Sequence, residues 1–368
     1  MATKRQNNIE CLRVLAMYLI IVGHVIGNAK LVTCAPALKQ LSGGGNLLNF
    51  SILELLWIVS GIAVNCYVMI TGYFLIERTD FRWKGFVGVW FQTLFYSAAI
   101  FAAVALLAGD AVGWKDILTK VTPIYHNTWW FITAYLCLLL VAPFLSLMAK
   151  SLTQRQYLLL LAVLFILVFE YPYGKLVSSK SPIVNFSFLF LLAGYIKLYG
   201  VPGVLARRLW LCIAVITLAM YIPAMAYNAY RLKCGQPLEP LASDRTFITL
   251  FLSAAVFCAF CSAQMEGRAA RLIGRMAPYT LGIYLVHCHP SLQRYIWVNT
   301  LPAVWPEPQW LSCPLNILGS AAVIFAACMA VDAVRKRIFG FLRVPRMVEA
   351  IAAKLPKLNN QKKQTKLI

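Results

Sequence analysis

The feature that most constrains this chain is a series of long apolar segments separated by short polar connectors. Each segment approaches the roughly 20 apolar residues that an α-helix needs to cross the hydrocarbon core of a bilayer. The sequence therefore predicts an all-α, polytopic membrane protein of about ten transmembrane helices. The expected spans are residues 11–29, 52–76, 86–108, 128–149, 156–172, 183–200, 208–228, 246–264, 276–298 and 313–334.

The composition supports this class and argues against others. Hydrophobic residues make up 61% of the 368 residues and charged residues only 13%, whereas about 25% of a soluble domain is charged. This excludes a disordered protein and argues against an ordinary soluble enzyme. A net charge of +21 is typical of nucleic-acid binding, but too few polar residues remain to build a solvated basic surface. We therefore expect no nucleic-acid partner, and basic residues that lie in the loops of a protein surrounded by membrane lipids.

The basic residues also predict an orientation. With the N-terminus inside, the inner segments hold more Lys and Arg than the outer ones, and a smaller excess remains without the C-terminal segment. Cytoplasmic loops carry such an excess, so both termini are expected in the cytoplasm. Residues 1–340 are expected to form the membrane domain, and residues 341–368 a basic cytoplasmic tail that touches anionic lipid.

Two ionisable residues, Arg13 and His24, lie inside the first span, where such side chains are costly and mark functional sites. Eleven residues of α-helix make about 1,100°, close to three full turns, so the two side chains point the same way. About 16 Å separates them along the axis, which places Arg13 near the inner interface and His24 beyond the midplane. Alternatively, Arg13 snorkels to the inner headgroups and His24 is a hydrogen-bonded core residue. The shared face favours a functional role for both.

A second histidine, His287, lies near the middle of the ninth span. It approaches His24 if the two helices are neighbours in the bundle. A packing or hydrogen-bonding role is an equally good interpretation of this residue.

Residues at the ends of spans give further candidates. Glu54, near the outer end of the second span, either orients a histidine or faces outside water, and we favour water. Trp129 and Trp130 open the fourth span as part of an aromatic belt or as a stacking platform for a sugar ring. The first inner loop is either an ordinary positive-inside loop or a clamp for a phosphorylated cytosolic ligand. Its cations are Arg78, Arg82 and Lys84.

The first two spans resemble the acyltransferase-3 family of membrane acyltransferases. The family's hallmark is Arg-x10-His in the first helix, and here it runs from Arg13 to His24. Residues 10–17 (ECLRVLAM) look like the start of that family. Residues 65–74 (NCYVMITGYF) are similar to its F-x-SGY stretch, with Thr71 in place of the commoner Ser.

Two later patches strengthen the resemblance. Trp130 and Phe131, followed by Pro143, are similar to a third family patch, and residues 282–287 (GIYLVH) to a fourth. The resemblance spans most of the chain. It is to the stand-alone branch, whose members modify surface polysaccharides and lack a fused hydrolase-like domain.

The resemblance implies ten helices and transfer of an acyl group, usually acetyl, from cytosolic acyl-CoA to a carbohydrate hydroxyl beyond the membrane. The acceptor is a cell-surface or lipid-linked glycan, and the location is the bacterial inner membrane. Arg13 and His24 are implied to be essential. The family's basic motif on the first inner loop is matched only loosely, by Arg82 and Lys84.

These expectations lead to a mechanistic hypothesis. The donor phosphates bind near Arg13 with help from Arg82 or Lys84, and the thioester lies beside His24. Neutral His24 acts as a general base on the sugar hydroxyl, or forms a transient acyl intermediate. His287 donates a hydrogen bond to the developing oxyanion, and no metal is expected.

Two interpretations from other classes remain. In a transporter or flippase for a lipid-linked saccharide, charged residues inside spans would line a path. Such proteins often have paired halves with interrupted helices, and no such pairing stands out in this sequence. A structural or sensor protein leaves the shared face of Arg13 and His24 unexplained.

Overall fold

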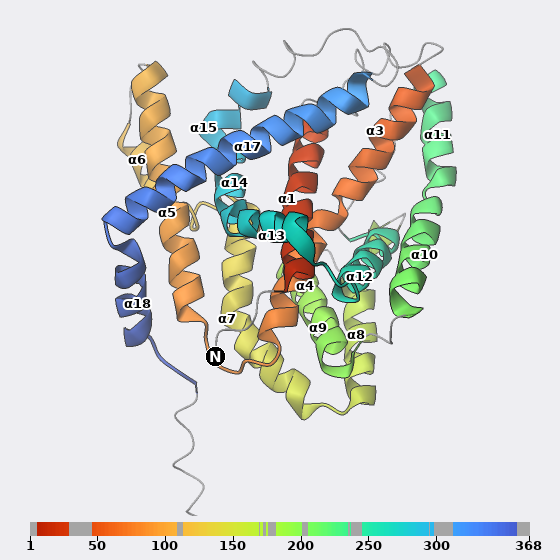
Figure 1. The fold of residues 1–368 in the computed structure, drawn as a ribbon, viewed down its shortest axis with the longest axis horizontal. Coiled ribbons are helices and arrows are strands. Elements are labelled where there is room, and N and C mark those ends of the chain that lie inside the picture. Colours follow the sequence, from red (N-terminus) through yellow and green to blue (C-terminus); the bar gives the residue numbers. More distant parts are fainter. Residues whose placement is uncertain are drawn as a thin grey trace, which may run out of the picture.

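The computed structural model describes residues 6–28, 46–108, 113–168, 170–171, 174–175, 182–200, 205–234, 236, 245–293, 295–297 and 312–358. Within these residues the chain is helical, apart from one short antiparallel pair of strands (Figure 1). The strands are β1 (Glu170–Tyr171) and β2 (Gly174–Lys175). The predicted helical class is confirmed.

Six segments of the described chain are long and apolar enough to cross a membrane. Four of them are continuous helices: α1 (Asn7–Asn28), α5 (Trp83–Ala108), α7 (Trp130–Ser151) and α17 (Ser312–Phe341). The other two are pairs of consecutive helices, α3 (Asn46–Ser60) with α4 (Ile62–Leu75), and α10 (Leu205–Ala219) with α11 (Ile222–Lys233).

Three further apolar helices are shorter, namely α8 (Gln154–Val168), α9 (Ile183–Tyr199) and α12 (Phe247–Cys261). Each predicted span other than 276–298 therefore coincides with a helix or a helix pair, but a count of ten membrane crossings is not confirmed.

The predicted ninth span, residues 276–298, is divided into η1 (Ala277–Tyr279), α14 (Thr280–His287) and α15 (Pro290–Gln293). Pro278 and Pro290 lie at the breaks, because proline lacks a backbone donor and disfavours helical conformation in the residue before it. The break leaves His287 in the last turn of a short helix.

The remaining helices are α6 (Trp114–Val121), α13 (Gly267–Met276) and α18 (Val344–Lys354). The segment predicted as a tail begins with α18, which packs beside α5 (Figure 1). Lys84 forms an ion pair with Glu349, and the Trp83 indole donates to the carbonyl of Pro356 at 2.6 Å. Apolar contacts of Val348 and its neighbours complete this docking.

Helix α1 lies at the centre of the bundle and packs against α3, α4, α12, α13, α14 and α17 (Figure 1). Gly23 and Gly27, one turn apart, face α3. A Cβ at Gly23 would lie 2.7 Å from Oγ of Ser60, and one at Gly27 would lie 2.9 Å from the Trp57 ring. The close approach of these helices therefore depends on small residues, as is common between membrane helices.

A second close approach joins α4 to α9. A Cβ placed on Gly72 would overlap the backbone of Phe190, which has no room to move aside as a flexible side chain would. This explains the glycine at position 72 of the family-like stretch of residues 65–74.

We expect Gly72→Ala to destabilise the protein by about 1–3 kcal/mol, because overpacking forces the α4 and α9 backbones apart. Thermal unfolding of the detergent-purified protein measures the effect. Gly88→Ala is the matched control, since nothing lies within 4 Å of a Cβ there. Equal stability of the two variants would contradict this account of the α4–α9 contact.

Candidate active site

Two histidines meet where α1 and α14 touch. Nδ1 of His24 lies 3.0 Å from Nε2 of His287, and the ring centroids are 5.2 Å apart. His287 is fully buried, with 0% of its surface exposed. The approach of His287 to His24 that the sequence suggested is therefore found.

The hydrogen bonds assign a tautomer to each ring. Nδ1 of His287 lies 2.6 Å from the carbonyl oxygen of Ile283, which can only accept, so this Nδ1 carries a proton. In the neutral ring Nε2 of His287 is then an acceptor, and Nδ1 of His24 donates to it. Neutral His24 is left with a lone pair on Nε2, the atom that can accept a proton from a substrate.

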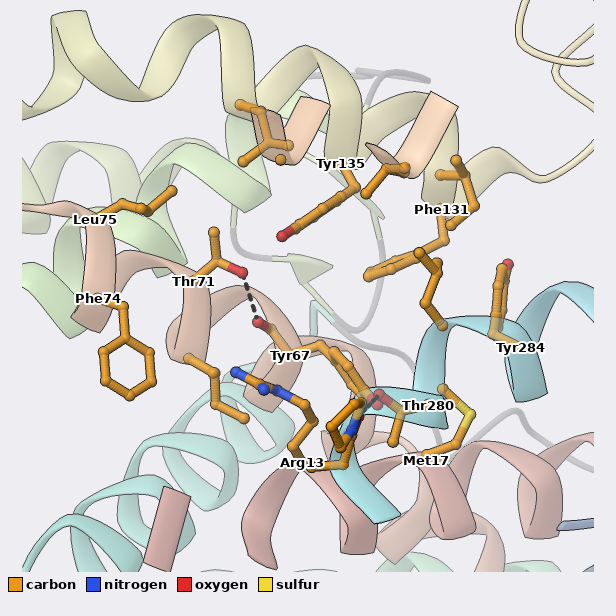
Figure 2. Close-up of a pocket in the computed structure, with 18 of the residues that line it drawn as sticks. Arg13, Met17, Tyr67, Thr71, Phe74, Leu75, Phe131, Tyr135, Thr280 and Tyr284 are labelled. Atoms are coloured by element: carbon orange, nitrogen blue, oxygen red, sulfur yellow. Dashed lines mark hydrogen bonds between the residues drawn. The ribbon is translucent and has the colours of Figure 1, made fainter. Parts of the chain in front are cut away.

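A cavity of about 340 Å³ lies along the α1 face that carries Arg13, and we call it the inner cavity after the side on which the sequence predicts Arg13 to lie. Figure 2 shows Arg13 and Tyr135 reaching into it from α1 and α7. Nη1 of Arg13 lies 2.9 Å from Oε2 of Glu10, so one nitrogen of the guanidinium is paired within the helix. Arg82 also lines this cavity and is exposed, which makes the cavity cationic at one end.

Tyr67 adds a polar group that the sequence analysis did not single out. Tyr67 and Thr280 both line the inner cavity (Figure 2), and the Tyr67 hydroxyl lies within hydrogen-bonding reach of the Thr280 side chain. A hydroxyl at this position can also bond a polar ligand in the cavity.

An outer cavity of about 230 Å³ is lined by His24, Trp57 and Trp130. The inner and outer cavities share three lining residues, Ile20, Phe131 and Tyr284, so they adjoin each other. Arg13 and His24 thus lie on one face of α1, as their spacing predicts, and each opens onto one of two neighbouring cavities.

The structure separates the other basic candidates. Arg82 joins Arg13 at the inner cavity, whereas Lys84 is paired with Glu349 of α18. The Lys84 ammonium lowers the pKa of the Glu349 carboxyl below its ordinary value through a hydrogen bond and charge attraction. Arg78 is exposed and does not line the cavity.

The two tryptophans also differ. Trp130 is 45% exposed and lines the outer cavity beside His24. Trp129 is buried, with its ring 5.5 Å from that of His289. Of the pair, only Trp130 lines the outer cavity.

Glu54 does not face outside water, and that expectation is wrong. The residue is 2% exposed, and its Oε1 accepts a hydrogen bond of 2.7 Å from the side-chain amide of Asn228. This contact joins α3 to α11. Glu54 lines neither cavity, so its role is to join these two helices.

Asp332 of α17 supports the helix that carries His287, and the sequence analysis missed it. Its fully buried carboxylate accepts hydrogen bonds from Gln92 at 3.1 Å and Tyr96 at 2.8 Å, and pairs with Arg335 at 2.9 Å. A Cβ on Gly282 of α14 would overlap this carboxylate. The network therefore fixes how closely α14 packs on α17.

These observations define a polytopic membrane protein with a histidine pair beside the outer of two adjoining cavities. The acyltransferase-domain model of the acyltransferase-3 family matches residues 6–332. The chain belongs to this family and is an integral membrane acyltransferase. A search of curated proteins returned no match, and neither did a search of solved structures.

We expect Asp332→Asn to lower stability by about 3 kcal/mol, because it leaves the buried Arg335 without its counter-charge while keeping an acceptor for Tyr96. Thermal unfolding in detergent measures the loss. Adding Arg335→Met should recover most of it, since the double variant contains no unpaired buried charge. A double variant no more stable than Asp332→Asn would argue against the ion pair as the dominant contribution.

Proposed function

We propose that this protein moves an acetyl group from cytosolic acetyl-CoA to a hydroxyl of a cell-surface or lipid-linked glycan. One observation carries the proposal: His24, whose Nε2 carries no proton, lines an aromatic-walled cavity that adjoins a second, cationic cavity. Family membership supports the acyl transfer, and the choice of acetyl-CoA and glycan is our inference from the chemistry of the two cavities.

The inner cavity suits the donor. Its volume of about 340 Å³ is enough for a thin pantetheine arm but not for the nucleotide, which would stay at the exposed Arg82 end. Glu10 holds only Nη1 of Arg13, so the other guanidinium donors are available to a phosphate. The hydroxyl of Tyr67, which lines this cavity, would bond a carbonyl of the arm.

The outer cavity suits the acceptor. Its volume of about 230 Å³ is small, and Trp57 and Trp130 give it flat aromatic walls of the kind that stack on sugar rings. His24 lines the same cavity, so a sugar hydroxyl that enters it meets the imidazole directly.

The tautomers of His24 and His287 determine how the proton moves during the transfer. Nε2 of His24 removes the hydroxyl proton as the oxygen attacks the thioester carbon, and Nδ1 of His24 keeps its hydrogen bond to His287. When the tetrahedral intermediate collapses, the C–S bond breaks. The leaving thiolate takes the proton back from Nε2, which gives free CoA and the acetylated hydroxyl.

We propose a positioning role for His287 in place of the oxyanion contact expected from the sequence. Its Nδ1–H is bonded to Ile283 and its Nε2 accepts from His24, so the neutral ring has no donor left for an oxyanion. Tyr284 is the better candidate for that contact. It lines both cavities, and its ring lies 5.9 Å from that of His287.

We expect His24→Ala to reduce transfer by about 10²–10⁴-fold, the usual contribution of a general base. Membranes containing each variant are incubated with acetyl-labelled acetyl-CoA, and label in the glycan fraction is counted. The matched control is His126→Ala, which removes an exposed histidine outside the site and should retain wild-type transfer. Near-normal transfer by His24→Ala would contradict the proposal.

The same labelled donor separates the remaining mechanisms. With acceptor omitted, a general base leaves no label on the protein, whereas an acyl-histidine mechanism leaves one acetyl group on His24. If label never reaches glycan while a lipid-linked saccharide crosses the membrane, the protein is a transporter instead.

We expect Arg13→Gln to raise the KM for acetyl-CoA about 10–100-fold with a smaller change in kcat, because a charged phosphate contact is lost. Arg13→Lys keeps the charge and should give an intermediate KM. Arg155→Gln removes an exposed arginine on α8 as the control. An unchanged KM in Arg13→Gln would remove Arg13 from the donor site.

A further inference from the structure

A cysteine completes a three-residue cluster at the histidine pair. Sγ of Cys288 lies 3.4 Å from Nδ1 of His24, the atom that also contacts His287. One ligand atom from each residue lies within 4.8 Å of the other two. The transfer mechanism proposed above makes no use of Cys288.

These distances are close to those of a metal site. With Zn–N bonds of about 2.0–2.1 Å and a Zn–S bond of about 2.3 Å, tetrahedral geometry puts two nitrogens about 3.3 Å apart and a nitrogen and a sulfur about 3.6 Å apart. The observed separations from Nδ1 of His24 are 3.0 Å to His287 and 3.4 Å to Cys288. Shifts of a few tenths of an ångström bring these two pairs to metal-binding geometry.

The surroundings of His287 also match those of a ligand. Metal-bound histidines usually donate their other N–H to a backbone carbonyl or a carboxylate, which orients the ring. Nδ1 of His287 already makes such a bond to Ile283, so its Nε2 lone pair is aimed at the cluster. Imidazole and thiolate together favour Zn²⁺ and similar borderline-soft ions over Mg²⁺ or Ca²⁺.

His24 is the member of the cluster that lines a cavity. His24 lines the outer cavity of about 230 Å³, which has room for water. Three protein ligands with a water in the fourth position are the arrangement of an open zinc site.

We propose that His24, His287 and Cys288 bind one Zn²⁺-class cation through Nδ1, Nε2 and Sγ, and that binding reversibly inhibits acyl transfer. The inhibition rests on the proposed function, whereas the metal site itself does not. This ion is an inhibitor and not a resident cofactor, in keeping with the expectation that catalysis needs no metal.

The proton balance explains the inhibition. The ion takes the place of the proton between the two imidazoles, and that proton moves to Nε2 of His24. The Cys288 thiol loses its proton to solvent, so one proton is released for each ion bound. Nε2 of His24 then carries a hydrogen and has no lone pair for a sugar hydroxyl.

Cobalt(II) tests the site without any activity measurement. The purified full-length protein in detergent is titrated with Co²⁺, which gives visible bands when tetrahedral and a near-ultraviolet charge-transfer band when bound to thiolate. We expect one thiolate-bound Co²⁺ per chain, displaced by Zn²⁺. Cys288→Ser and Cys288→Ala should lose the charge-transfer band. Cys66→Ser, which removes a buried cysteine of α4 outside the cluster, should keep it.

Activity tests the inhibition. Zn²⁺ should block label transfer in wild type and in Cys66→Ser, and EDTA should restore it. Cys288→Ser should transfer label normally and need roughly tenfold more Zn²⁺ for the same block, because one ligand of three is lost.

The outcomes separate the two proposals. No stoichiometric Co²⁺ binding, or an equal charge-transfer band in Cys288→Ser, would overturn the metal site. Binding through Cys288 that leaves transfer unchanged would overturn the inhibition. Co²⁺ binding through Cys288 in a protein that never transfers label would support the site while the proposed function fails.

Discussion

The hydrogen bond between Nδ1 of His24 and Nε2 of His287 joins two helices whose residues lie 263 positions apart in the chain. Its direction is set by the carbonyl of Ile283, which must accept from the other nitrogen of His287. Inside a low-dielectric protein each member of such a chain of bonds has to be satisfied, so one backbone carbonyl determines which nitrogen of His24 keeps a free lone pair. The basicity that we assign to the site follows from this single arrangement.

Close helix packing brings the two rings together. Gly23 and Gly27 let α1 approach α3 on either side of His24, and Gly282 lets α14 approach the buried carboxylate of Asp332. Between membrane helices there is little hydrophobic driving force, so close packing of small residues and hydrogen bonds between helices stabilise their association. The site therefore depends on packing residues as well as lining residues: Gly23 lines the outer cavity, whereas Gly282 and Asp332 line neither cavity.

The features that could be predicted from the sequence are those that depend only on the geometry of a single helix. The shared face of Arg13 and His24 follows from a fixed rotation per residue, and the structure places each at one of two adjoining cavities. The break of the ninth span could also have been predicted, because Pro278 and Pro290 were visible. Asp332 is an ionisable residue inside a predicted span, so the criterion that selected Arg13 also applies to it.

Other features depend on contacts between distant segments and carry no local signal. Glu54 is buried because Asn228, 174 residues away, bonds to it. Lys84 is paired with Glu349 of α18, a helix that lies in the segment predicted as a tail. Nothing in the sequence indicates these two pairings, because Glu, Asn and Lys are also ordinary residues of solvated loops.

The central claim is that donor and acceptor reach His24 from opposite sides of the membrane through two adjoining cavities. Proteoliposomes of known orientation test it directly, with labelled acetyl-CoA confined to one side and a glycan extract to the other. The account predicts labelled glycan when acetyl-CoA is on the side of Arg82 and glycan on the side of Trp130, and none when both are on one side. Product formed only when both substrates share a side would contradict it.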